Sequence, residues 1–372
     1  MSSRGSLLIA YCLVSGCTEI SFGPGGAGGS GPTSTGSAAS TGAAGGSGGA
    51  SMVGVGGTAV GAGGAGGGCD ADLDESPGNC GACGHDCAGG DCAAGLCQPL
   101  VLLQPAGVSV HEVVAIGDDV FAMSSTGLYS MKVDDPPGSA SFVTNTTGGT
   151  HLAIFDGRPF WTSGTVHYLD EEGAYRSYGQ TIQCSGDLAI TSAGGLFCVY
   201  EDFALWTLFR HPNDSNWFTN VAPGVGIATL GEDLVVSTPT EVVRVPINDP
   251  ASPETLVDDP ALRDIVTFDS SVFFGSGTSI FEYQSGAGAI ELVTGVANAR
   301  VLHVDETDVY FATGDLPIIS RVSRLGANQN GDVWVFEDSD LKPSFMAGDD
   351  TFLFFSAGAK GLYRIRKPPS AQ

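Results

Sequence analysis

From Leu100 onwards, short apolar runs alternate with turns that are rich in Gly, Asp, Asn and Pro. Valine, isoleucine, threonine and aromatic residues dominate the runs, which is typical of β-strands. No long segment shows the 3.6-residue apolar period of an amphipathic helix. The pattern therefore predicts an all-β fold for residues 99–372.

One turn recurs through this region at a nearly constant spacing. A strand ends, an acidic or glycine turn follows, and an aromatic or aliphatic strand begins. The turns are centred near residues 118, 157, 194, 232, 270, 307 and 349, at intervals of 37 to 42 residues. Each interval also has room for a third strand and a looser fourth one. Four antiparallel strands in a unit of this length are typical of one propeller blade.

We therefore predict that residues 99–372 form a seven-bladed β-propeller. A blade cannot bury both of its faces alone, so the blades must stack in a ring. The seventh repeat ends with its third strand, Leu362–Ile365, whereas Leu100–Leu103 precedes the first repeat without a partner. Pairing these two segments would complete the last blade and remove an exposed sheet edge.

Residues 69–98 are predicted to form a small disulfide-rich module. So few apolar residues accompany its six cysteines that the segment needs cross-links to fold. We expect three bridges, and the sequence leaves their pairing open. The cysteines are Cys69, Cys80, Cys83, Cys87, Cys92 and Cys97.

Two alternatives for this module involve a metal ion. Cys80, Cys83, His85 and Cys87 have a spacing that zinc could use. The acidic run Asp70–Asp74 resembles the start of a calcium loop, although Glu75 stands where such a loop needs glycine. We favour disulfides and predict no metal and no cofactor, because dense cysteines in an exported chain are usually oxidised.

Cys184 and Cys198 lie in the third repeat and are also predicted to form a disulfide. A simple hairpin that turns near residue 193 sets Cys198 opposite about Ala189. A bridge then requires the preceding loop to fold across, because the two Cα atoms must come within about 7 Å. The alternative is two small buried thiols.

The N-terminal part of the chain predicts export. The apolar run Leu7–Val14 is too short to span a bilayer, which needs about 20 residues, but it suits a signal peptide. The sequence Val14-Ser15-Gly16-Cys17 resembles the lipobox of bacterial lipoproteins. The resemblance implies that residues 1–16 are cleaved and that lipidated Cys17 anchors the protein to a membrane. The alternative is an ordinary cleaved signal peptide.

Residues 17–68 are predicted to form a disordered tether. Positions 24–68 contain no charged residue and consist mainly of Gly, Ala, Ser and Thr. Such a segment cannot bury enough apolar surface to offset its ordering entropy. As a flexible chain it would span roughly 35–40 Å on average and lift the folded part away from the membrane.

The tether and the module together resemble a recurring arrangement. The run Asn79-Cys80-Gly81-x-Cys83-Gly84-x-x-Cys87 is similar to a cysteine-rich module in secreted proteins of myxobacteria, where it often follows a Gly/Ser tether. This resemblance covers about 30 residues and implies a protein of the cell envelope, at the outer membrane or cell surface. It implies no particular activity.

The charge balance limits the partners. The formal net charge is -26, with only 15 Lys and Arg residues. Nucleic acid is excluded as a partner because no basic surface is present to displace phosphate counterions. We expect a monomer that engages an extracellular protein or glycan.

Aligning the repeats places polar residues where the inner strands of the propeller begin. These equivalent positions are Glu112, His151, Asp187, Gly226, Asp264, Arg300 and Ser344. We predict a ligand-binding ring at the channel mouth, formed by the five ionisable residues among them. The alternative is a mouth that is polar only because water fills it.

No catalytic constellation is evident. The sequence lacks a G-x-S-x-G elbow, an H-E-x-x-H motif and a P-loop. We therefore predict a tethered binding or scaffolding protein without catalytic residues, and keep a lyase or hydrolase at the channel mouth as the alternative. His303 alternates with Leu302 and Val304, which predicts a hydrogen-bonded core residue.

The predicted anchor can be tested on the mature protein. Mass spectrometry of the N-terminal peptide should show Cys17 as the first residue, carrying diacylglycerol. The Cys17→Ala variant should lose that mass and leave the membrane fraction. An unmodified mature N-terminus in the wild-type protein would contradict lipidation.

Overall fold

A computed structural model describes residues 72–104, 107–145, 149, 151–177, 187–191, 194–202, 205–211, 215–221, 226–238, 240–258, 265–296, 298–313, 316–324, 330–336 and 340–368. These residues belong to one compact unit, Gly66–Gln372. The predicted leader, the tether with Cys17, and residues Cys69, Cys184 and Asp264 lie outside the described residues.

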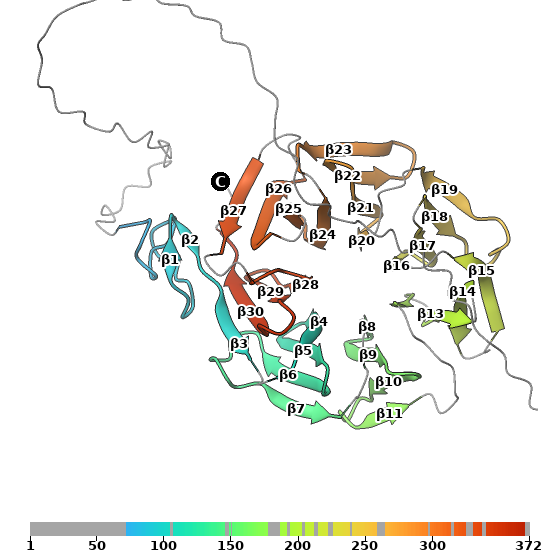
Figure 1. The fold of residues 1–372 in the computed structure, drawn as a ribbon, viewed down its shortest axis with the longest axis horizontal. Coiled ribbons are helices and arrows are strands. Elements are labelled where there is room, and N and C mark those ends of the chain that lie inside the picture. Colours follow the sequence, from blue (N-terminus) through green and yellow to red (C-terminus); the bar gives the residue numbers. More distant parts are fainter. Residues whose placement is uncertain are drawn as a thin grey trace, which may run out of the picture. The chain divides into compact units, whose positions relative to one another are not determined.

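The regular elements of the described chain are β-strands (Figure 1). No helix in this part of the chain is long and apolar enough to cross a lipid bilayer. A short hairpin in the cysteine-rich segment pairs β1 (Cys92–Ala93) with β2 (Leu96–Cys97). The remaining strands form four-stranded antiparallel sheets.

Six of these sheets are each built from four consecutive strands. The first blade contains β4 (Val110–Ile116), β5 (Asp119–Ser124), β6 (Leu128–Lys132) and β7 (Ser141–Thr144). The second contains β8 (Leu152–Phe155), β9 (Arg158–Thr162), β10 (Val166–Leu169) and β11 (Tyr175–Ser177). The third contains β12 (Leu188–Ile190), β13 (Leu196–Asp202), β14 (Leu205–His211) and β15 (Ser215–Val221). The fourth blade contains β16 (Gly226–Leu230), β17 (Asp233–Ser237), β18 (Val242–Val245) and β19 (Glu254–Val257). The fifth contains β20 (Ile265–Phe268), β21 (Ser271–Ser276), β22 (Ser279–Gln284) and β23 (Gly288–Thr294). The sixth contains β24 (Ala299–Val304), β25 (Asp308–Thr313), β26 (Ile318–Ser323) and β27 (Asn330–Val335).

The last sheet is a composite of the two ends of the propeller region. It contains β28 (Phe345–Gly348), β29 (Phe352–Ser356) and β30 (Leu362–Arg366), with β3 (Leu100–Leu103) as its outer strand. β3 pairs antiparallel with β30, so that Leu100 lies opposite Arg364 and Leu103 opposite Leu362. We call this sheet the composite sheet.

This strand order corrects the predicted count of seven blades, whereas the predicted pairing of Leu100–Leu103 with the last strand is confirmed. In the part of the chain that the structure describes, six complete blades, not seven, are each formed by one continuous repeat. The C-terminal repeat supplies only three strands, and the fourth place in its sheet is taken by a strand from the opposite end of the region. The reason is that the chain has no fourth strand after Arg366 among the described residues, so the edge of β30 needs a partner from elsewhere.

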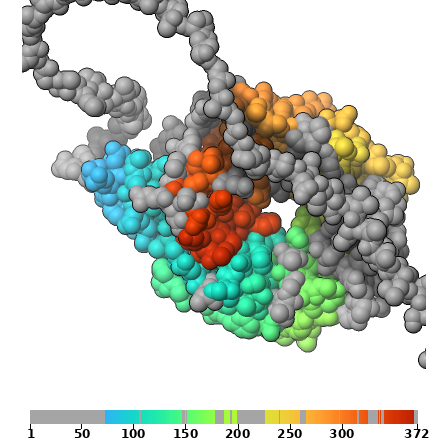
Figure 2. Space-filling view, viewed as in Figure 1, coloured from blue at the N-terminus to red at the C-terminus, as the bar shows by residue number. Residues whose placement is uncertain are grey.

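The sheets are arranged in a closed ring. The inner strands β4, β8, β12, β16, β20, β24 and β28 each pack against the next, and β28 packs against β4. The blades surround a central opening (Figure 2). Apolar clusters fill the spaces between neighbouring sheets. At the junction of the composite sheet and the first blade, Val113 and Val120 are buried against Phe352 and Phe354. Each sheet therefore buries its faces against its two neighbours.

The cysteine-rich segment is cross-linked and attached to the composite sheet. Cys80 pairs with Cys92, and Cys87 pairs with Cys97. Cys83 and Cys198 are also disulfide-bonded. Cys198 lies opposite Leu188, one residue from the predicted register. The two described bridges support the predicted disulfide module.

Backbone carbonyls of this segment accept hydrogen bonds from the composite sheet. Arg364 donates to the carbonyl of Ala88 over 2.9 Å and to that of Val133, in the first blade, over 2.6 Å. Its guanidinium also lies 4.7 Å from the centroid of the Phe352 ring. One arginine thus joins the cysteine-rich segment, the composite sheet and the first blade.

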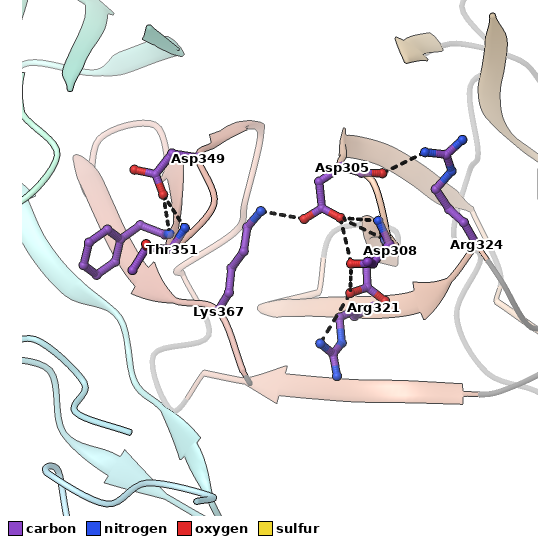
Figure 3. A network of polar contacts seen from close by, with 9 residues as sticks. Asp305, Asp308, Arg321, Arg324, Asp349, Thr351 and Lys367 are labelled. Atoms are coloured by element: carbon purple, nitrogen blue, oxygen red, sulfur yellow. Dashed lines mark hydrogen bonds and ion pairs between the residues drawn. The ribbon is translucent and has the colours of Figure 1, made fainter. Parts of the chain in front are cut away.

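The chain after β30 is held to the sixth blade by an ion pair. Lys367 Nζ lies 2.5 Å from Asp305 Oδ2 (Figure 3). Burial alone would raise the pKa of Asp305, but the hydrogen bond and charge of Lys367 outweigh that effect and lower it. His85 of the cysteine-rich segment contacts the Lys367 carbonyl through Nε2 at 3.0 Å. The C-terminal segment is therefore fixed on both sides.

The closure of the composite sheet predicts an unequal effect of two glycine substitutions. A Cβ atom on Gly361, whose φ is +110°, would collide with the carbonyl of Leu103 in β3. Gly361→Ala should therefore lower the free energy of unfolding by about 2–4 kcal/mol. Gly286 has a φ of +85° and open space around its Cβ position, so Gly286→Ala should cost only about 1 kcal/mol. Urea unfolding of the two variants measures the difference, and equal losses would show that the β3 contact contributes nothing.

Candidate functional site

Polar side chains gather where the inner strands begin. Glu112 lies in β4, Asp187 directly precedes β12, and Arg300 is the second residue of β24. Since the inner strands surround one channel, these positions meet at one end of it. They line a cavity of about 420 Å³ together with Gly226 and Ser344. Cavities of about 300–1,000 Å³ are the usual size for small-molecule sites.

The structure thus brings together most of the positions that the alignment of repeats selected. Glu112, Asp187 and Arg300 line the cavity. His151 directly precedes β8 and contacts two of the lining residues. Asp264 lies outside the described residues.

His151 lies between two carboxylates from the neighbouring blades. Its Nδ1 is 2.8 Å from Asp187 Oδ1 and 3.7 Å from Glu112 Oε2. The contact with Asp187 is an ion pair at hydrogen-bond length. All three side chains are less than one-third exposed. Their charges therefore interact more strongly than they would at an open surface.

Burial and mutual charge shift the acidity of this group. Burial raises the pKa of Glu112 to about 8, and the nearby Asp187 carboxylate adds to the rise, against the opposing charge of His151. Burial alone would lower the pKa of His151, but its contact with Asp187 and the charge of Glu112 outweigh that effect and raise it. Glu112 therefore retains a proton at neutral pH that the isolated side chain would release.

The same polar side chains also connect adjacent blades. Glu112 Oε2 accepts a hydrogen bond from the Leu152 amide over 2.8 Å, and Asp187 Oδ2 accepts one from the Ile227 amide over 3.3 Å. Arg300 donates to the Ser344 carbonyl over 3.0 Å. Each bond joins one inner strand to the next, so these residues stabilise the ring as well as lining its mouth.

One residue of the channel differs from its prediction. His303 was expected to be a hydrogen-bonded core residue, but it lines the same cavity as Arg300. It stacks on Tyr310, with ring centroids 5.9 Å apart. Burial, with a further contribution from the charge of Lys367, lowers the pKa of His303 to about 4. The imidazole is therefore neutral at pH 7.

The metal alternatives for the cysteine-rich segment do not fit its geometry. Among the described residues, the sulfur atoms of Cys80, Cys87 and Cys97 lie within 4.8 Å of one another, close enough to share an ion. All three sulfurs are in disulfides, so none is a thiolate ligand. Both ring nitrogens of His85 face backbone carbonyls. The acidic residue Asp70 of the possible calcium loop lies outside the described residues.

Comparison with known proteins identifies the fold. No protein-family model matches this sequence, and no curated protein matches it either. Solved structures do match. Virginiamycin B lyase from Staphylococcus aureus is 16% identical, with a TM-score of 0.54, and the match covers 73% of this chain and 98% of the lyase.

Two further structures show how widely the fold is shared. A catalytically inactive variant of the same lyase, solved with quinupristin, is 15% identical with a TM-score of 0.55, covering 73% of this chain and 98% of that one. The WD40 β-propeller domain of Doa1 is 11% identical with a TM-score of 0.55, covering 72% and 95%. This chain is a β-propeller. At such identities the likeness shows the fold alone.

The acidity of the mouth predicts a pH-dependent stability. Glu112 has a pKa of about 8 in the folded protein, against 4.5 for the free side chain, so its stabilising contribution is complete below pH 4.5 and is lost as the pH rises through 8. His151, with its raised pKa, acts in the same direction. Thermal unfolding midpoints should therefore fall between pH 6 and pH 9. Glu112→Gln cannot ionise and should flatten this fall, and an unchanged slope in that variant would contradict the assignment.

Proposed function

We propose that this protein is a lipid-anchored binding protein of the cell envelope, and that the mouth of its propeller channel holds the ligand. The propeller would stand on the tether, which Cys17 would fix to the membrane. The ligand would be a protein- or glycan-derived molecule outside the cytoplasm. The observation that carries this proposal is the convergence of Glu112, Asp187 and Arg300 on one cavity.

The chemistry of the mouth supports binding. Charges of both signs face one cavity that both polar and apolar groups line, and this combination gives both orientation and affinity for a small ligand. Strand ends hold these side chains, and hydrogen bonds to the next blade orient two of the carboxylates. A site fixed in this way loses little entropy when a ligand binds.

A lyase is the second candidate, and one contact favours it. Nδ1 of His151 faces Asp187 and Glu112, and Nε2 has no partner among the described residues. A carboxylate that holds one imidazole nitrogen while the other remains accessible is the usual arrangement of a general acid or base. Quinupristin, the compound solved with the related propeller, is a suitable probe.

The binding proposal can be tested with two matched substitutions. Asp187→Asn removes a charge from the mouth, whereas Asp119→Asn removes one from an exposed ion pair with Lys132. A panel of short peptides and oligosaccharides, screened by saturation-transfer NMR on the full chain, should contain a ligand. Asp187→Asn should weaken its binding at least tenfold, or about 1.4 kcal/mol, and Asp119→Asn should not.

Two results would change this conclusion. If no compound binds, or if the two variants bind alike, the channel mouth is not the ligand site. If the full chain cleaves quinupristin and His151→Ala abolishes the cleavage, the second candidate is correct. The binding proposal expects quinupristin to remain intact.

A further inference from the structure

The two described disulfides of the cysteine-rich segment lie against each other. The first bridge joins Cys80 to Cys92, and the second joins Cys87 to Cys97. The Cys80 sulfur lies within 4.8 Å of both sulfurs of the second bridge. In thiol–disulfide exchange, a thiolate attacks one sulfur of a disulfide and displaces the other. If the first bridge opens, the freed Cys80 sulfur therefore already lies beside the second, at a high effective concentration.

The four sulfurs of these bridges differ in their exposure to solvent. Cys80, Cys87 and Cys97 are buried, whereas Cys92 is only partly buried. A dissolved thiol can therefore reach the first bridge at Cys92, while both cysteines of the second bridge are shielded. Attack on the Cys92 sulfur makes Cys80 the leaving group. The accessible sulfur is thus the one whose reaction frees the sulfur beside the second bridge.

The second bridge fixes the entry to β3, the strand that completes the composite sheet. Cys97 lies three positions before the first residue of β3. Its partner Cys87 adjoins Ala88, whose carbonyl accepts a hydrogen bond from Arg364 of β30. The bridge therefore holds β3 and the Ala88 carbonyl against the same sheet. Once it opens, β3 keeps only its pairing with β30 and its apolar contacts.

We propose that Cys92 is a site of thiol–disulfide exchange for a dithiol, and that the reaction passes to the second bridge and loosens β3. One thiolate of the dithiol attacks Cys92, forms a mixed disulfide and displaces Cys80. The second thiol of the reagent then displaces Cys92, so the dithiol leaves as a disulfide.

The Cys80 thiolate completes the transfer. It attacks Cys87, forms a new disulfide with it and frees Cys97. Attack on Cys87 is favoured because the loop from Cys80 to Cys87 is shorter than the loop from Cys80 to Cys97 and costs less entropy to close. In total, two electrons and two protons pass from the dithiol to the protein, whose two bridges become one bridge and two thiols.

The surroundings of Cys92 limit the kind of dithiol that reacts. Residues 69–98 contain six Asp and Glu residues and no Lys or Arg. The Cys92 sulfur lies 3.3 Å from the carbonyl oxygen of Asp74, and the exposed Asp91 directly precedes Cys92. Negative charge around the entry repels an anionic reagent. The site therefore suits a neutral dithiol.

This preference is tested with two dithiols that differ in one charge. Dihydrolipoamide is neutral, whereas dihydrolipoate carries a carboxylate. At low ionic strength the amide should open the first bridge of the full chain about threefold faster or more, and about 0.5 M salt should remove the difference. Equal rates at low ionic strength would show that the acidic surroundings do not select the reagent and would contradict the neutral class.

The transfer between bridges is tested with two matched variants. Cys92→Ser and Cys80→Ser remove the same bridge, but they leave different sulfurs behind. In Cys92→Ser the Cys80 thiol lies beside the second bridge and should form a new disulfide with Cys87 without any reductant. Cys92 is not among the three sulfurs that lie within 4.8 Å of one another, so the second bridge should stay intact in Cys80→Ser.

Mass spectrometry assigns these bridges. Cleavage at Asp86, Asp91 and Leu96 places the four cysteines in different peptides. A new bridge to Cys80 in Cys92→Ser alone supports the transfer. An intact second bridge in both variants, or the same shuffling in both, would show that the position of Cys80 has no special role and would contradict it.

The unmutated chain gives a test that does not require either variant to fold. After brief treatment with dihydrolipoamide, free thiols are alkylated and the digest is mapped. Among the four cysteines, Cys92 and Cys97 should be alkylated while Cys80 remains in a bridge. Alkylation of Cys80 and Cys92 beside an intact second bridge, or opening of the second bridge before the first, would overturn the proposal. A new bridge from Cys80 to Cys97 would keep β3 fastened and contradict its release.

The effect on the ring is measured by hydrogen exchange of Leu100–Leu103. This segment should exchange about tenfold faster or more in Cys92→Ser than in Cys80→Ser, because only the former loses the second bridge. Equal exchange would show that the bridge does not hold β3, and the proposed loosening would be wrong. None of these results depends on a ligand at the channel mouth, so this inference and the proposed function can fail separately.

Discussion

The structure depends on one constraint, which is that a four-stranded sheet with two apolar faces must be covered on both sides. Each of the six complete blades covers a face of its neighbours. The ring can close only if the C-terminal repeat also presents a full sheet. β3 supplies the missing strand by pairing with β30. The fold of the whole region therefore depends on a contact between residues that are more than 250 positions apart in the sequence.

The contacts around this junction are correspondingly dense. Arg364 connects three parts of the chain through backbone carbonyls, and Lys367 connects the C-terminal segment to the sixth blade. The cysteine-rich segment lies against the same junction through Ala88 and His85. Its disulfides have a structural consequence, because they hold two groups that contact the rest of the protein. These are the Ala88 carbonyl, which contacts Arg364, and the His85 imidazole, which contacts the Lys367 carbonyl. The module is part of the closure of the ring as well as a spacer after the tether.

The ring in turn creates the candidate site. A closed ring brings the starts of its inner strands together, so residues about forty positions apart in sequence become neighbours at the channel mouth. Glu112, His151 and Asp187 come from three blades, and their burial and contact together raise the pKa values of Glu112 and His151. The same bonds that hold adjacent blades together orient these side chains, so stability and recognition depend on the same residues.

The repeat spacing was sufficient to predict the blades and the positions at the mouth, because both follow from a regular unit. His303 was missed because β24 has a bulge between Val301 and His303. The bulge changes which face the following residue occupies, and simple alternation cannot detect it. The contacts of Arg364 could not be predicted either, since carbonyl acceptors carry no signal in the sequence. The number of complete blades could not be predicted from the repeat spacing, and it follows from the observed strand order.

Hydrogen exchange of β3 tests the central claim, that this strand closes the ring, most directly. Peptides that cover Leu100–Leu103 and Leu362–Arg366 can be followed by mass spectrometry in the full chain. The account predicts that both segments are protected to the same degree, because their amides belong to one sheet. Rapid exchange of Leu100–Leu103 beside a protected Leu362–Arg366 would show that the ring closes without β3 and would contradict the account.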